Sequence, residues 1–99
     1  MIVHVDGDAA EVTQGDDLRA LRIVAEDDVA GPLAAAGLGG EPAGDGERWL
    51  DVERLRTLAR EGAAGDDWDD RWAAMMAWAA KSGWVDGSGA RVRAHVERP

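Results

Sequence analysis

The sequence predicts an α+β domain in which a small antiparallel sheet packs against two or three α-helices. Short apolar runs bounded by turn residues lie near both ends of the chain, and two segments with helical periodicity lie between residues 51 and 82. A length of 99 residues with 45% hydrophobic content suits one domain over residues 1–99. We therefore expect N-terminal strands and a C-terminal β-hairpin to form one sheet.

The first strands are predicted near the N-terminus. Residues 2–5 form an apolar run that ends in an Asp-Gly-Asp turn, and residues 9–13 return as a second strand. Residues 18–25 are the next expected strand, with alternate apolar side chains on one face. A helix over residues 18–25 remains the alternative, because several of the same side chains also fit helical spacing.

The sequence pattern in the middle of the chain indicates little regular structure. Residues 29–38 are expected to form a short helix, because the acids at 26–28 favour the positive end of a helix dipole. Residues 39–46 contain four glycines and one proline and are predicted to be a surface loop. Trp49 and Leu50 then form a brief extended segment.

Two amphipathic helices follow. Asp51 is the expected N-cap of the first helix, which runs through Glu61 and ends at Gly62. The second helix has Asp66 as its expected cap, and Gly83 suits the left-handed position that ends it. Its apolar face is predicted to pack on the sheet and carries large side chains at helical spacing: Trp68, Trp72, Met75, Met76 and Ala79, with Trp78 on the flank.

A C-terminal hairpin completes the predicted sheet. Trp84 and Val85 precede a turn over residues 86–89, and an alternating strand follows. Its apolar side chains point one way (Val92, Ala94 and Val96), and its polar side chains point the other way (Arg91, Arg93, His95 and Glu97).

In element order, residues 50–97 resemble a winged helix-turn-helix: two helices joined by a glycine-containing turn, then a hairpin. The resemblance implies a transcriptional regulator whose second helix enters the DNA major groove while Arg91 and Arg93 act from the wing. A recognition helix leads with its N-terminal residues, and here these include four aspartates between residues 66 and 70. Phosphate binding needs several basic side chains, so the charge argues against nucleic acid as a partner.

The net charge of −9, from 20 acidic and 11 basic residues, also repels anionic membrane surfaces. The acidic residues are concentrated in residues 1–30, which contain eight acidic and two basic side chains. No apolar run approaches the about 20 residues of a membrane span, and no secretory signal is evident, so a cytoplasmic location is expected. The bias toward Ala, Gly, Asp, Arg and Val is typical of a high-GC bacterial genome.

Catalytic and metal-binding patterns are weak, and we expect neither an enzyme nor a cofactor or metal. There is no cysteine. His4 and His95, the two histidines, both lie on predicted strands, and a pairing of Asp86 with His95 is most simply a cross-strand contact. The acids at 6, 8 and 11 lack the glycine and glutamate offsets of a calcium-binding loop, and no glycine-rich segment follows a strand as a dinucleotide motif requires.

The function that remains is a non-enzymatic module that acts by protein–protein contact. Five tryptophans and three methionines give a small domain a large apolar surface to bury. Both residue types are enriched at interfaces. The partner is expected to be a second copy or a basic protein docked on the N-terminal acids. A small ligand-binding or catalytic domain is a further alternative and needs a concave pocket near Trp49, Trp72 or His95. The expected contact residues are Trp78, Trp84, Arg91, Arg93 and His95.

Overall fold

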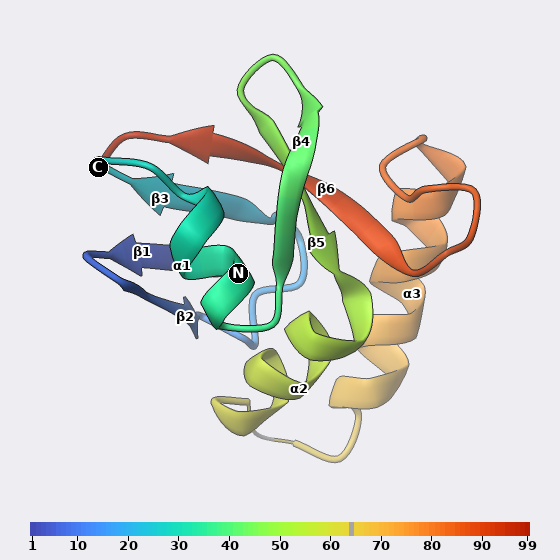
Figure 1. The fold of residues 1–99 in the computed structure, drawn as a ribbon. Coiled ribbons are helices and arrows are strands. Elements are labelled where there is room, and N and C mark those ends of the chain that lie inside the picture. Colours follow the sequence, from blue (N-terminus) through green and yellow to red (C-terminus); the bar gives the residue numbers. More distant parts are fainter. Residues whose placement is uncertain (64) are drawn as a thin grey trace.

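The computed structural model describes residues 1–63 and 65–99 and shows an α+β fold, a six-stranded sheet with three helices (Figure 1). The strands are β1 (Ile2–Asp6), β2 (Ala9–Thr13), β3 (Arg22–Ala25), β4 (Gly39–Gly44), β5 (Glu47–Asp51) and β6 (Arg91–Glu97). The helices are α1 (Ala30–Ala35), α2 (Val52–Glu61) and α3 (Trp68–Lys81).

The sheet is mixed, which corrects the expectation of a purely antiparallel one. Its strand order is β2-β1-β3-β6-β5-β4, and β3 pairs in parallel with both β1 and β6. The three remaining pairings are antiparallel. The chain turns through residues 18–21 before β3, so only residues 22–25 of the predicted strand are extended. That turn lets β3 run beside β1 in the same direction.

The C-terminal strand lies inside the sheet rather than at the tip of a hairpin. β6 pairs with β3 on one side and β5 on the other, and so joins the two halves of the sheet. The expected hairpin is reduced to one bridge between Val85 and Val92. The order α2, α3, β6 matches the winged-helix comparison, but β6 is not a projecting wing, because both of its edges are occupied by other strands.

Residues 39–44 form strand β4, where a loop was predicted. The glycines at 39 and 40 have positive φ, and the pairing with β5 shifts register on both sides of Pro42. Proline and glycine are tolerated there because β4 is an edge strand. Gly40 also allows close packing, since a Cβ at this position would lie 2.8 Å from Cβ of Leu33.

The helix boundaries follow the predicted caps at most positions. Asp51 caps α2 by accepting a hydrogen bond from the Arg54 amide at 3.3 Å, and Gly62 ends that helix. Helix α3 begins after Asp67 rather than Asp66, and the Asp67 side chain makes no capping hydrogen bond. Gly83 has a φ of 83°, as its predicted role requires.

The core lies inside the curl of the sheet. Helix α1 contacts both edge strands, β2 and β4, and α1 and α2 lie on the near side of the sheet in Figure 1. The inward side chains of the central strands are buried there: Val3, Val5, Ile23, Ala25, Leu50, Val92 and Ala94. Trp68 and Trp72 of α3 join this core with their rings stacked at 5.4 Å, as predicted. None of the described helices is long and apolar enough to cross a bilayer.

Candidate functional site

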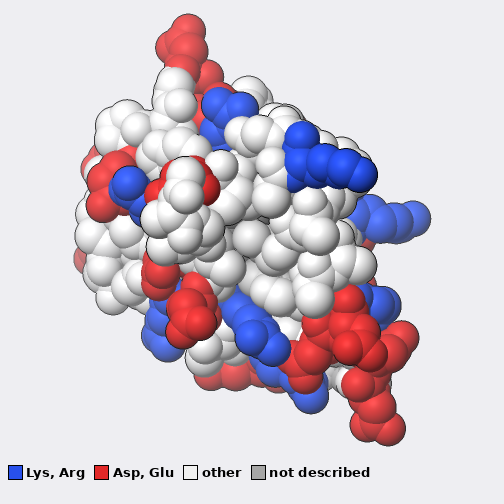
Figure 2. Space-filling model, turned by 90° about the vertical axis from the view of Figure 1, so that its right-hand side faces the viewer, with Lys and Arg blue, Asp and Glu red and all other residues white. Residues whose placement is uncertain are grey.

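A groove of about 480 Å³ lies between α3, the loop that precedes β3, and strand β6. It is lined mainly by apolar side chains, and the lining residues are Leu18, Arg19, Ala20, Leu21, Met75, Met76, Trp78, Ala79, Trp84, Val92, Arg93 and His95. Figure 2 looks onto the α3 side of the molecule, where uncharged residues form a broad area with charged groups around its margin. This groove is the candidate site.

Helix α3 forms the first wall because its large apolar side chains are fully buried only in its first half. Trp68 and Trp72 are 0% and 4% exposed, whereas Met75 and Met76 on the following turn are partly buried. Trp78, on the flank of the apolar stripe, is 62% exposed and is the one large hydrophobic side chain that stands out in solvent among the described residues. The second half of α3 therefore presents apolar surface beside a concavity.

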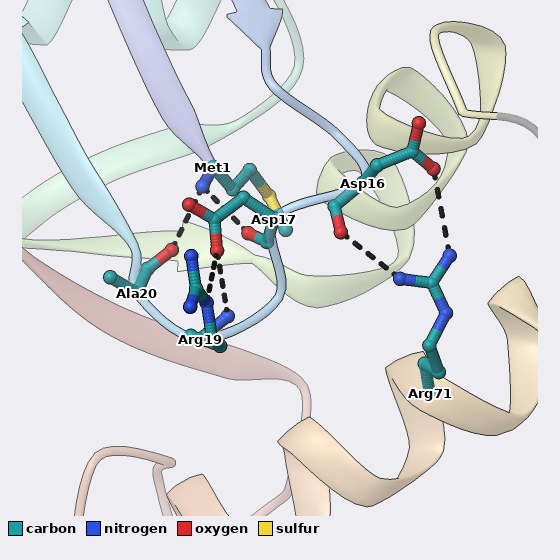
Figure 3. A network of polar contacts seen from close by, with 6 residues as sticks. All are labelled: Met1, Asp16, Asp17, Arg19, Ala20 and Arg71. Carbon is teal, nitrogen blue, oxygen red and sulfur yellow. Dashed lines mark hydrogen bonds and ion pairs between the residues drawn. The ribbon is translucent and has the colours of Figure 1, made fainter.

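The loop before β3 forms the second wall, and α2 and α3 hold it in place. The backbone of Gly15 passes so close to α2 that a Cβ on it would lie 2.3 Å from the Ala59 carbonyl oxygen. The buried indole of Trp68 donates a hydrogen bond to the Gly15 carbonyl at 2.8 Å. Arg71 donates to the Asp16 carbonyl at 3.1 Å and lies 3.6 Å from its carboxylate (Figure 3).

The amino group of Met1 holds the next part of the same loop. It donates hydrogen bonds to the Asp17 carbonyl at 2.7 Å and to the Ala20 carbonyl at 3.0 Å (Figure 3). Burial lowers the pKa of this amino group. The Asp17 carboxylate accepts hydrogen bonds from the amide and side chain of Arg19, which lower the pKa of Asp17. The wall at residues 18–21 is thus fixed without a ligand.

Strand β6 and Trp84, which lies in the segment that follows α3, supply the third wall. The guanidinium of Arg93 lies 5.0 Å from the centre of the Trp84 ring, a cation–π arrangement. It also donates to the Gly83 carbonyl at 3.1 Å and lies 3.9 Å from the Glu47 carboxylate. Its Nε is buried and makes no hydrogen bond within the described part of the chain. His95 is exposed two residues further along β6.

Four of the five predicted contact residues meet in this groove: Trp78, Trp84, Arg93 and His95. Arg91 does not, although it shares a strand face with Arg93. Its Nε lies 3.1 Å from the Asp86 carboxylate, and its guanidinium lies 5.8 Å from the centre of the Trp49 ring. The lining residues 18–21 were not predicted. Leu18 and Leu21 are apolar, but the sequence pattern predicts them as part of a strand over residues 18–25.

The expected contact between Asp86 and His95 does not form. The Asp86 carboxylate accepts a hydrogen bond from the Ser88 hydroxyl at 2.8 Å and others from Arg91. These hydrogen bonds lower the pKa of Asp86 to about 2, and the bond from Ser88 has the largest effect. His4 lies on β1, and β3 separates that strand from β6 and His95. Among the described residues, no three His, Cys, Asp or Glu side chains are grouped so that they could hold a metal ion.

Comparisons of the chain with family models, curated proteins and solved structures gave no significant match.

Proposed function

We propose that this chain is a cytoplasmic, non-enzymatic module that binds another protein, and that the groove beside α3 is its contact surface. The exposure of Trp78 is the observation that carries the proposal. A tryptophan that is 62% exposed costs solvation free energy unless a partner covers it, and here it adjoins an apolar groove.

The composition of the groove supports a protein contact. Tryptophan, methionine and arginine are among the residue types enriched at protein interfaces, and the groove holds Trp78, Trp84, Met75, Met76 and Arg93. Its loop wall is held by Trp68, Arg71 and the Met1 amino group, so little ordering is needed on binding. Because the walls are already ordered, more of the free energy gained from burying apolar surface contributes to affinity.

The test uses short random peptides selected on the immobilised protein, then synthesised and measured by fluorescence anisotropy. Interface tryptophans that act as hot spots contribute about 2 kcal/mol or more, so Trp78→Ala should weaken selected peptides by about 30-fold. Trp49→Ala is the matched control, because this partly buried indole lies outside the groove and its loss should leave the affinity unchanged. Equal binding to the wild type and to Trp78→Ala would disprove the proposal.

A small-molecule ligand is the second candidate, and the groove volume favours it. Ligand pockets span roughly 300–1,000 Å³ and combine apolar walls with a few polar groups, and this groove holds about 480 Å³ beside Arg93 and His95. It also meets the requirement of a pocket near His95. A fragment screen that follows the methyl resonances of Met75 and Met76 would test this. Fragments that shift neither methyl group would count against a small-molecule site.

A further inference from the structure

On the basis of the proposed contact surface, we infer that its partner is an acidic amphipathic peptide segment. Apolar side chains of the segment occupy the groove, while neighbouring Asp or Glu carboxylates meet Arg19, Arg93 and His95. The net charge of the chain suggests a basic partner, whereas this inference assigns an acidic one.

The charge of the lining differs from that of the molecule. The chain has 20 acidic and 11 basic residues. Among the described residues that line the groove, two are arginines, one is a histidine and none is acidic. A basic partner would therefore bury its charges against Arg19 and Arg93, whereas an acidic segment would pair with them.

The two arginines retain donors for such a segment. Each guanidinium has five N–H donors. Arg19 has a side chain that is 91% exposed, and its one ion pair within the described residues is through Nε to Asp17 at 3.3 Å. Arg93 uses one terminal nitrogen on the Gly83 carbonyl, and its contact with Glu47 is long at 3.9 Å. The exposed Arg19–Asp17 pair contributes little, and the Arg93–Glu47 contact is long, so a carboxylate of the segment can add to both.

A second copy of the chain fits this chemistry poorly. A two-fold contact places the same surface on both sides, so the basic rim would face itself. The exposed Trp78 is followed on α3 by Lys81. The acidic and aromatic residues do meet at the start of α3, but Trp68 there is 0% exposed. Within residues 1–63 and 65–99, a copy therefore offers no exposed tryptophan flanked by acids.

The net charge of −9 does not prevent an acidic segment from binding. At physiological ionic strength the Debye length is about 8 Å, so distant acids are largely screened. Contacts inside the groove then depend on the side chains that line it, Arg19, Arg93 and His95, and on Asp17 and Glu47 beside the two arginines.

The test examines the peptides selected on the wild-type protein. We expect apolar residues flanked by Asp or Glu, and we expect versions with Gln and Asn at the acidic positions to bind more weakly. Arg19→Glu should weaken an acidic peptide by about tenfold and should favour its lysine-substituted version, since both attraction and repulsion change. Arg98→Glu is the control: it alters the net charge equally at an exposed position outside the groove.

The outcomes separate this inference from the proposed function. Selected peptides that lose binding to Trp78→Ala but are neutral or basic would overturn the inference alone, as would equal effects of Arg19→Glu and Arg98→Glu. A wild-type dimer that Trp78→Ala dissociates would assign the groove to a second copy and also overturn it. Peptides that do not distinguish Trp78→Ala from the wild type would overturn both.

Discussion

A single methyl group at Gly15 should destabilise the whole domain. Its Cβ would lie 2.3 Å from the Ala59 carbonyl oxygen, a backbone atom within helix α2 that cannot rotate away. Overpacking of this kind costs about 1–3 kcal/mol. The loop must move to relieve it, which breaks the bond between the Trp68 indole and the Gly15 carbonyl. A buried donor without a partner costs about 1–3 kcal/mol more.

The Gly15→Ala variant should therefore lose about 2–6 kcal/mol of unfolding free energy. In a domain of this size, each kcal/mol lowers the melting temperature by about 4–8 °C. Urea titration followed by circular dichroism measures the loss. Gly31→Ala in α1 is the matched control, because nothing lies within 4 Å of its Cβ position, and alanine there should be neutral or slightly stabilising.

A double-mutant cycle tests the physical cause. Trp68→Phe keeps an aromatic ring but removes the indole donor and part of the buried ring volume, so its own cost combines a lost hydrogen bond with a cavity. If Gly15→Ala acts partly through the Trp68 bond, the double variant should lose less than the sum of the two single losses. A Gly15→Ala protein within about 0.5 kcal/mol of the wild type would refute the close approach and the fixed loop wall.

Two further predictions test the local contacts. Asp51→Ala should cost about 0.5–2 kcal/mol, since its carboxylate caps α2, whereas Asp67→Ala should cost less because that 71% exposed side chain caps nothing; equal losses in urea titrations would contradict the assigned caps. Asp86 titrates at about 2 in the folded protein against an ordinary value of 3.8, so its carboxylate stabilises the fold above pH 3.8 and loses this effect as the pH falls toward 2. The stability gap between the wild type and Asp86→Asn should therefore narrow from pH 4 to pH 2, and a constant gap would contradict the Ser88 and Arg91 hydrogen bonds.

Local pattern was enough to predict the elements whose boundaries depend on neighbouring residues. Asp51 and Gly62 delimit α2 because capping is a short-range interaction. Trp68 and Trp72 point inward because they lie on one stripe of a helix, and β6 alternates because side chains in a strand do so. The same patterns selected Trp78, Trp84, Arg93 and His95 as expected contact residues, and all four line the groove, which the patterns did not predict.

Pairing between distant segments was decided only by the tertiary structure. Gly39–Gly44 forms a strand because β5 and Leu33 provide partners that its own composition does not indicate. Arg91 and Arg93 have the same local pattern, yet one pairs with Asp86 and the other lines the groove. Residues 18–21 became a wall because Gly15 fits against α2 and the Met1 amino group binds the loop carbonyls. Periodicity specifies the face on which a side chain lies, but the neighbour it meets there depends on which arrangement buries the most apolar surface across the whole chain.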